Sequence, residues 1–337
     1  MTRLARLCRT GRISIAAGIV WMLAGSAHAG WQSVTDQAMG TRIHAEAWHA
    51  DDVIASAALQ QVLAEMHRID EAFSPYKPDS ELSVLNRMAP KGWTGVSGEL
   101  LKLLLAGQRV SEMTQGAFDL TFASAGRYYD YREGVAPDAE TLDASIAAID
   151  YRHIEIDAAA ARVRFRHPAT YVDLGGIAKG YAVDQAAAIL ARAGIGQASV
   201  AAGGDSRILG DRRGQPWVVG VRHPRRAGQM AVRLPLTDTA ISTSGDYERF
   251  FIRDGERFHH ILDPSSGTSA KNSMSVTILG PSGILTDALS TSVFVLGAVK
   301  GLALIDGMPG IDAIVIDENG KMSYSSDLLP HSSEGGR

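Results

Sequence analysis

Asp287 and Thr291 are candidates for chemistry, because they stand four residues apart in an apolar run whose spacing predicts a helix. Residues four apart project from one helix face, so the carboxylate and the hydroxyl are expected to lie side by side. Both are hard oxygen ligands that suit Mg²⁺ or Ca²⁺ better than zinc. Taken alone, the pair is explained more simply as a helix-start carboxylate and a packed hydroxyl.

A second candidate is the glycine turn at Gly175 and Gly176, between an extended run over 169–174 and a helical pattern from about 177 to 193. The N–H groups and positive dipole end of a helix N-terminus suit an anion such as a phosphate. Lys179 works against that dipole, so we expect an anionic ligand to compensate its charge. An ordinary strand–helix junction explains the segment equally well, and it matches neither the Walker loop nor the Gly-x-Gly-x-x-Gly signature.

His260 lies in a strand pattern just before a proline-led turn, and it could act as an acid or base near neutral pH. A half-buried strand histidine is the simpler explanation. The pair Gly203 and Gly204 would let a ligand or another backbone approach closely, or would simply form a tight bend. Neither a Gly-x-Ser-x-Gly elbow nor a His-Glu-x-x-His pair is present, which weakens the serine-hydrolase and metalloprotease hypotheses.

Ring-binding groups are scattered through the first half of the chain. Asp119, in the run Gly-Ala-Phe-Asp, could accept a hydrogen bond from the N–H edge of a heterocycle. Met39 and Tyr76 could supply apolar or stacking surface to a ring, although each alone is more simply core or loop packing.

The N-terminus predicts an export signal. Four arginines precede an apolar run over 13–23, which is too short to span a bilayer comfortably, and a small-x-small site ends at Ala29. We therefore expect cleavage after Ala29 and a periplasmic protein of 308 residues (337 − 29), whose charge falls from −4 to −8 with the four arginines. An acidic chain of this kind is a poor nucleic-acid binder. The only cysteine, Cys8, lies inside the signal, so neither a disulfide nor a thiolate metal site is expected in the mature chain.

The remaining patterns predict the elements that must position these groups. Amphipathic helices over about 53–73, 97–114 and 286–296 are interspersed with short alternating strands, many of them paired as hairpins. No later run of eighteen apolar residues exists, so no transmembrane helix is expected in the mature chain. The order of elements favours an α+β fold with mixed, largely antiparallel sheets and flanking helices. We expect one compact catalytic unit over 30–327, a signal peptide over 1–29 and a disordered tail over 328–337.

Seven segments in order, spread over nearly the whole mature chain, resemble the FAD:protein FMN transferase family, the ApbE-like flavin transferases. They are Met39-Gly-Thr, Tyr76-Lys-Pro-Asp-Ser-Glu-Leu, Gly116-Ala-Phe-Asp, Val172-Asp-Leu-Gly-Gly-Ile-Ala-Lys-Gly-Tyr-Ala, Ala202-Gly-Gly-Asp, His260-Ile-Leu-Asp-Pro and Thr286-Asp-Ala-Leu-Ser-Thr. The resemblance implies an ApbE-like fold and an enzyme that cleaves the FAD pyrophosphate. It also implies transfer of FMN to a threonine of a flavin-accepting subunit of a membrane redox complex, with AMP released and Mg²⁺ required.

The resemblance also assigns roles to individual residues. The metal ligands would be the Gly176 carbonyl, the Asp287 carboxylate and the Thr291 hydroxyl, and His260 and Asp287 would be catalytic. FAD contacts would fall on Met39, Tyr76, Ala117, Phe118, Asp119, Asp173, Lys179 and the backbone near Ile261. Many family members are lipoproteins, whereas this chain lacks the lipid-accepting cysteine.

Two other functions compete with transfer. The same site with water as the nucleophile would be a metal-dependent FAD pyrophosphatase. A flavin-binding or flavin-storage protein without catalysis is the other possibility, but binding a flavin requires no metal-ligand face.

Overall fold

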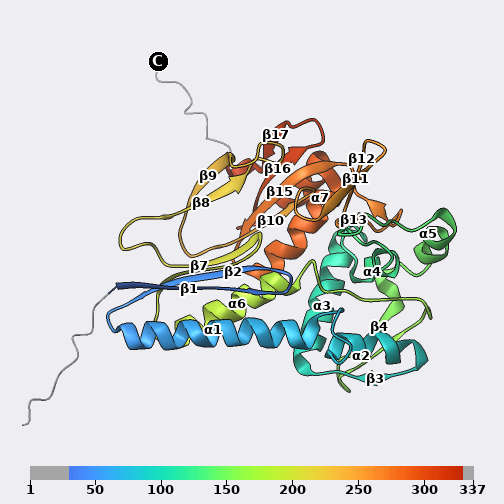
Figure 1. Ribbon diagram of the computed structural model, residues 1–337, viewed down its shortest axis with the longest axis horizontal. Helices are drawn as coiled ribbons and strands as arrows, with labels where there is room; N and C mark the ends of the chain where they lie inside the picture. Colours follow the sequence, from blue (N-terminus) through green and yellow to red (C-terminus); the bar gives the residue numbers. More distant parts are fainter. Residues whose placement is uncertain (1–29, 329–337) are drawn as a thin grey trace, which may run out of the picture.

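The computed structural model describes residues 30–328, so the predicted signal peptide and the tail from residue 329 lie outside the described residues. Its centre is an eight-stranded sheet in which every recorded pairing is antiparallel (Figure 1). In spatial order its strands are β1 (Gly30–Ala38), β2 (Thr41–His49), β6 (Gln197–Ala202), β7 (Asp205–Leu209), β10 (Ala240–Gly245), β15 (Ser273–Gly280), β16 (Asp312–Asp317) and β17 (Met322–Tyr324).

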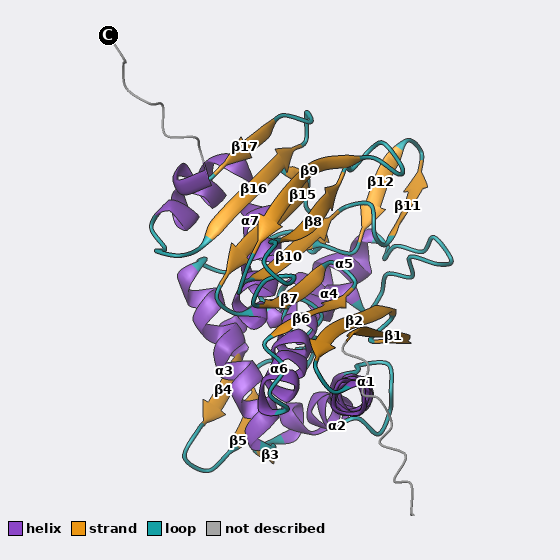
Figure 2. Cartoon of the chain, turned by 90° about the vertical axis from the view of Figure 1, so that its left-hand side faces the viewer, coloured by secondary structure: helices purple, strands orange, loops and turns teal. Residues whose placement is uncertain are grey.

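Three long helices pack on this sheet, as Figures 1 and 2 show from two directions. They are α1 (Asp52–Phe73) on β1 and β2, α6 (Ala178–Arg192) on β6 and β7, and α7 (Gly283–Asp306) on β10, β15 and β16. A separate hairpin is formed by β8 (Trp217–Arg222) and β9 (Met230–Leu236), and β8 lines a cavity together with residues of β7 and β10. The α+β prediction is confirmed.

The remaining helices and a small sheet form a second group of elements. It contains α2 (Glu81–Met88), α3 (Gly98–Met113), α4 (Ala123–Gly126), α5 (Ala139–Ile146), and a small sheet of β3 (Thr94–Gly95), β5 (Arg162–Phe165) and β4 (Ile154–Asp157). Two short hairpins complete the strands: β11 (Phe250–Arg253) with β12 (Glu256–His259), and β13 (Leu262–Asp263) with β14 (Thr268–Ser269). The 3-10 turns are η1 (Ala89–Lys91), η2 (Leu120–Phe122), η3 (Tyr151–His153) and η4 (Ser326–Leu328).

The α1 helix begins where the sequence predicts, because the Asp51 side chain accepts a hydrogen bond from the Val53 N–H and caps it. The apolar spacing predicts a buried stripe of Val53, Ala57, Val62, Met66 and Ile69. The last three are buried, but Val53 and Ala57 are exposed, and the buried positions at the start of the helix are Ala55, Ala58 and Leu59. The small side chains of Ala55 and Ala58 let the start of α1 lie close to the β1–β2 hairpin, which apolar spacing alone does not reveal.

The strand predicted over 169–174 is wrong, because this extended segment has no strand partner. Its backbone is instead satisfied by a side chain and loops. Asn86 donates to the Val172 carbonyl and accepts from the Val172 N–H, both at 2.8 Å, and the Asp173 N–H donates to the Leu120 carbonyl at 3.0 Å. These bonds fix the segment that leads into the glycine turn.

The α7 helix is long and apolar enough, by length and composition, to cross a membrane. More than half of its most apolar window is buried inside the protein, against β10, β15 and β16. Its composition is therefore accounted for by its position as the central core helix. Gly297, with φ 75° and ψ 175°, interrupts the helical conformation just after the helix predicted over about 286–296.

Candidate active site

The glycine turn and the acidic helix, more than a hundred residues apart in the chain, meet in the structure. The Gly180 N–H in the first turn of α6 donates to Asp287 Oδ2 on α7 at 2.9 Å. A Cβ built on Gly176 would lie 3.4 Å from Thr291 Oγ1 and 2.9 Å from the Phe118 ring. The predicted convergence of these two segments is confirmed, while metal binding by them stays a prediction.

Two glycines allow α6 and α7 to cross almost backbone to backbone. A Cβ on Gly180 would lie 2.0 Å from the Gly283 carbonyl oxygen, and a Cβ on Gly283 would lie 2.4 Å from the Gly180 carbonyl oxygen. No side chain larger than hydrogen fits at either position without moving a helix. This crossing brings the Asp287 carboxylate within reach of the start of α6.

Each helix also supplies a carboxylate to the N-terminus of the other. Asp184 on α6 accepts hydrogen bonds from the N–H groups of Gly283 and Ile284 at 2.8 and 3.0 Å, and Asp287 on α7 accepts from Gly180. A negative charge is stabilised at a helix N-terminus by the free N–H groups and the dipole. The two exchanged carboxylates therefore fix both the distance and the rotation of the helices.

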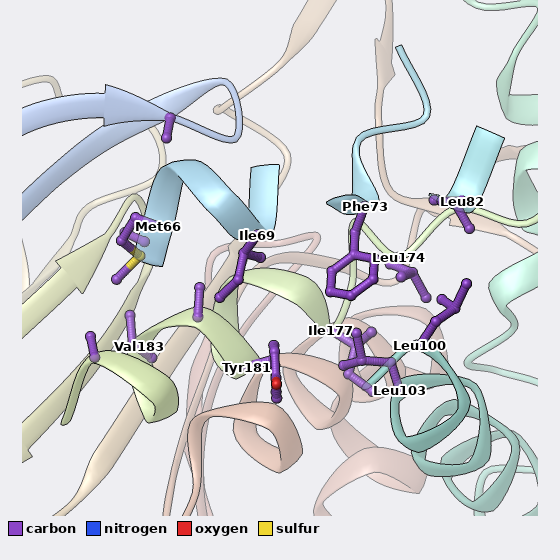
Figure 3. Packing of buried hydrophobic residues seen from close by; sticks show 14 of the residues in the cluster. Met66, Ile69, Phe73, Leu82, Leu100, Leu103, Leu174, Ile177, Tyr181 and Val183 are labelled. Carbon is purple, nitrogen blue, oxygen red and sulfur yellow. The ribbon is translucent and has the colours of Figure 1, made fainter. Parts of the chain in front are cut away.

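The glycine turn is held in place by its neighbours. Leu174 and Ile177, which flank it, are fully buried in the core beside Leu100 and Leu103 of α3 (Figure 3). With its two ends anchored in this way, the turn presents Gly175 and Gly176 toward α7.

Three oxygen atoms at this crossing have the chemistry of a hard-metal site. The Gly180 N–H, which a regular helix would direct to the Gly176 carbonyl, goes to Asp287, and no N–H among residues 30–328 donates to the Gly176 carbonyl. Within the described part of the chain, the hydroxyl of Thr291 has a single hydrogen-bond contact, at 3.4 Å to Ser244 Oγ. The carbonyl, the carboxylate and the hydroxyl thus retain lone pairs and suit Mg²⁺ or Ca²⁺, which take oxygen ligands and waters. Within the described part of the chain no three His, Cys, Asp or Glu residues cluster as a softer metal would require.

The structure corrects the expectation that an anionic ligand alone compensates the charge of Lys179. Its charge is compensated by carboxylates of the protein itself, not only by a ligand: Nζ lies 3.0 Å from Asp205 Oδ2 and 3.3 Å from Asp287 Oδ1. Burial opposes the charged ammonium, but the two carboxylates outweigh it and raise the pKa of Lys179. Burial and the neighbouring Asp205 carboxylate raise the pKa of Asp287 to about 7, against the opposing effects of Lys179 and the Gly180 N–H.

His260 follows directly after β12 and is tied to the adjacent strand by its own N–H, which donates to the Arg249 carbonyl at 3.2 Å. Its Nδ1 atom is buried and has no hydrogen-bond partner among the described residues. Burial, together with the positive charge of Arg249, lowers the pKa of His260 to about 3. The ring is therefore neutral and has a nitrogen free to take a proton or a hydrogen bond.

Of the predicted FAD contacts, Tyr76 is exposed and Asp173 is partly buried. Tyr76 is 83% exposed, so a face of its ring is available for stacking. Asp173 accepts a hydrogen bond from the Gly175 N–H at 2.7 Å, and burial raises its pKa. Met39 forms the turn between β1 and β2 with φ 52°, next to Gly40, whose carbonyl accepts a 3.4 Å hydrogen bond from Arg249.

The other predicted FAD contacts are more enclosed. Phe118 is buried against Gly176, Ala117 packs on the core around α7, and the Ile261 carbonyl accepts from the Ala270 N–H at 3.0 Å. Asp119 serves its own loop: Oδ1 accepts from the Thr121 N–H and hydroxyl, and Oδ2 accepts from the Tyr151 N–H. Burial raises the pKa of Asp119. The structure therefore gives this carboxylate an architectural function in addition to the predicted contact.

Three residues of the site were not predicted from the sequence. Asp205 follows the flagged Gly203 and Gly204 directly, so the motif pointed to its neighbourhood but not to its pairing with Lys179. Asp184 and Arg249 carry no local signal, because only the folded chain brings them to α7 and to the β1–β2 turn. A cavity of about 190 Å³ at the far end of α7, lined by residues that include Asp306 and Asp312, contains none of the predicted site residues.

Comparison with known proteins agrees with this geometry. Residues 39–315 match the model of the ApbE family. The chain is 31% identical over 291 residues to the FAD:protein FMN transferase of Treponema pallidum, covering 81% of this chain and 80% of that protein. It is also similar to the crystal structure of the ApbE protein of Thermotoga maritima, with a TM-score of 0.80 and 34% identity over 88% of this chain and 98% of that one. For the flavin transferase ApbE of Vibrio cholerae the TM-score is 0.78 and the identity 28%, over 89% and 98% of the two chains.

Proposed function

The chain belongs to the ApbE family and is a flavin transferase, and from this premise we propose that it moves the FMN half of FAD to a threonine hydroxyl of an acceptor protein, releasing AMP. The observation that carries the proposal is the meeting of the Gly176 turn with Asp287 and Thr291 at the N-terminus of α6. That point combines oxygen ligands, a helix N-terminus and the Lys179 ammonium, a combination suited to a diphosphate with its metal.

The bonds change as follows. The threonine oxygen attacks the phosphorus on the flavin side of the pyrophosphate, and a new P–O bond forms. The bond from that phosphorus to the bridging oxygen breaks, AMP leaves with the bridging oxygen and its electron pair, and the threonine proton passes to a base. Catalysis of such a transfer depends mainly on positioning and on neutralising charge.

Each residue of the site has a place in this scheme. Lys179 binds phosphate oxygens, Tyr76 stacks on a ring of FAD, and His260 accepts the threonine proton. Gly176, Asp287 and Thr291 would hold Mg²⁺, with Ca²⁺ as the other hard cation that fits. When bound, that ion supplies charge stabilisation for the transferred phosphoryl group and the departing AMP.

His260 is a weak base without substrate, since its pKa is lowered to about 3 by burial and by Arg249, with a smaller effect of Lys179. A bound diphosphate brings negative charge to the same neighbourhood. That charge opposes the two cations and raises the pKa of the imidazole toward the range in which it accepts protons.

We further propose that the chain is exported to the periplasm by residues 1–29 and that its acceptors are flavin-carrying subunits of membrane redox complexes. The basic start and the apolar run over 13–23 support export. Amino-terminal sequencing of the protein recovered from the periplasm should begin at Gly30. A protein that retains its first residues and stays in the cytoplasm would contradict the proposal.

The deciding experiment combines the mature protein, FAD, Mg²⁺ and a candidate acceptor domain, and weighs the acceptor for added FMN. Asp287→Ala should abolish metal-dependent transfer and leave the fold intact, whereas Asp306→Ala, an exposed aspartate at the other end of α7, should transfer normally. Full flavinylation by Asp287→Ala would count against the assignment. Rapid release of FMN and AMP without an acceptor would identify the chain as a pyrophosphatase instead.

A further inference from the structure

The Lys179 ammonium lies between two buried carboxylates that come from different elements. Its Nζ atom is 3.0 Å from Asp205 Oδ2 on β7, and 3.3 and 3.4 Å from the two oxygens of Asp287 on α7. The Gly175 carbonyl accepts a further hydrogen bond from it at 3.3 Å. A single cation is thus shared between one carboxylate proposed to bind a metal and one that has no such function.

Asp205 depends on this lysine. It is 2% exposed, and Lys179 is the only cationic side chain within ion-pair distance of it among the described residues. A buried carboxylate without a partner is costly, so the pair keeps Lys179 close to β7. Asp205 faces α7 because it pairs with Ser242 across β7 and β10, and Ser242 contacts Thr286 of α7.

We propose that Asp205 is a positioning residue that draws the Lys179 ammonium away from Asp287 and so leaves that carboxylate available to a divalent cation. The inference rests on the proposed function, in which Asp287 is a metal ligand. An ammonium paired with Asp287 alone competes with the metal for the same oxygens, whereas an ammonium paired with Asp205 remains beside the metal site to meet a phosphate.

Direct electrostatic attraction between Asp205 and the metal ion must be distinguished from the effect of Asp205 on Lys179. Asp205 carries a negative charge near the site and could favour a cation by direct attraction. Direct attraction does not depend on Lys179, whereas competition does. A double-mutant cycle on Asp205 and Lys179 distinguishes the two.

The test is calorimetric titration of Mg²⁺ into four metal-free proteins at pH 8 without FAD: the mature protein, Asp205→Asn, Lys179→Met and the double variant. Asp205→Asn should weaken Mg²⁺ binding by about tenfold or more, in the range found for groups that orient metal ligands. Lys179→Met should bind Mg²⁺ more tightly than the unmodified protein. In the Lys179→Met background, Asp205→Asn should change the affinity by less than about threefold.

Asp246→Asn is the matched control, because Asp246 is also a buried aspartate, but it pairs with Arg225 at 2.6 Å instead of with Lys179. Its Mg²⁺ affinity should equal that of the unmodified protein. Equal losses from Asp205→Asn in both backgrounds would overturn the proposal in favour of direct attraction, as would unchanged affinity in Asp205→Asn. If Asp205→Asn does not fold, the Lys179→Met variant still tests the proposal, and weaker Mg²⁺ binding by Lys179→Met than by the unmodified protein would overturn it. An unmodified protein that binds no Mg²⁺ would refute the proposed metal site itself, which is a separate result.

Discussion

Replacing Gly180 with alanine tests the contact on which the candidate site is built. The new methyl group would stand 2.0 Å from the Gly283 carbonyl oxygen, 2.5 Å from its carbon and 2.7 Å from the Cβ of Asp287. Two of these three atoms are backbone, so no rotamer change relieves the clash. The α6 and α7 helices must separate by about 1.4 Å to restore ordinary contact distances.

The cost follows from the same distances. Overpacking a tight interior typically destabilises a protein by about 1–3 kcal/mol, and a clash with backbone on a central helix belongs at the upper end. For a chain of this size about 3 kcal/mol lowers the unfolding temperature by roughly 5 °C. Separation of the helices also lengthens the 2.9 Å hydrogen bond from Gly180 to Asp287, so we expect Mg²⁺ affinity to fall by about tenfold.

Thermal unfolding and Mg²⁺ titration at 20 °C, where the variant remains folded, measure both effects. Gly98→Ala is the control, because Gly98 begins α3, has no neighbour within 4 Å of its Cβ position and should be neutral or slightly stabilised by alanine. If Gly180→Ala unfolds at the temperature of the unmodified protein and binds Mg²⁺ equally well, the close crossing of α6 and α7 is wrong.

Two further predictions concern single side chains. Because burial lowers the pKa of His260 to about 3 from 6.5, the unfolded chain takes up a proton below pH 6.5 that the folded chain refuses, so stability is lost as the pH falls from 6.5 toward 3. Between pH 7 and pH 5 this amounts to roughly 2 kcal/mol, and urea unfolding should show His260→Asn free of that loss; an identical pH dependence in both proteins would contradict the neutral, buried imidazole. Tyr76→Ala should weaken FAD binding by about tenfold without changing the unfolding temperature, since the side chain is 83% exposed, and fluorescence titration with FAD measures it. Tyr128→Ala, at another exposed tyrosine, is the control, and equal FAD affinity in Tyr76→Ala would exclude stacking there.

Prediction from the sequence succeeded where local rules govern the structure. The helices predicted over about 53–73 and 97–114 are present as α1 and α3, and the side chains of Asp51 and Ser97 cap them. In each case the deciding hydrogen bond or backbone conformation lies within a few residues. The same holds for Gly194, whose φ of 80° ends α6.

The predictions that failed concern contacts between residues that are far apart in the sequence. The run over 169–174 looks like a strand, but whether its backbone pairs with a strand or with Asn86 depends on a residue more than eighty positions away. The strand β1 was not predicted, because its polar alternating face is recognisable only once β2 pairs with it. The pairing of Lys179 with Asp205 and Asp287 likewise exists only after β7 and α7 pack on α6.

The exchanged carboxylates of Asp184 and Asp287 have a consequence for how the molecule comes apart. If α7 detached while α6 remained, Asp184 would lose both its N–H partners and Gly180 would lose its acceptor, so neither helix can fray from the other without exposing orphaned groups on both. The pair therefore behaves as one cooperative unit. A partly unfolded state that retains an intact site is therefore disfavoured. We expect substrate binding to be lost in the same transition that unfolds the native core, and not before it.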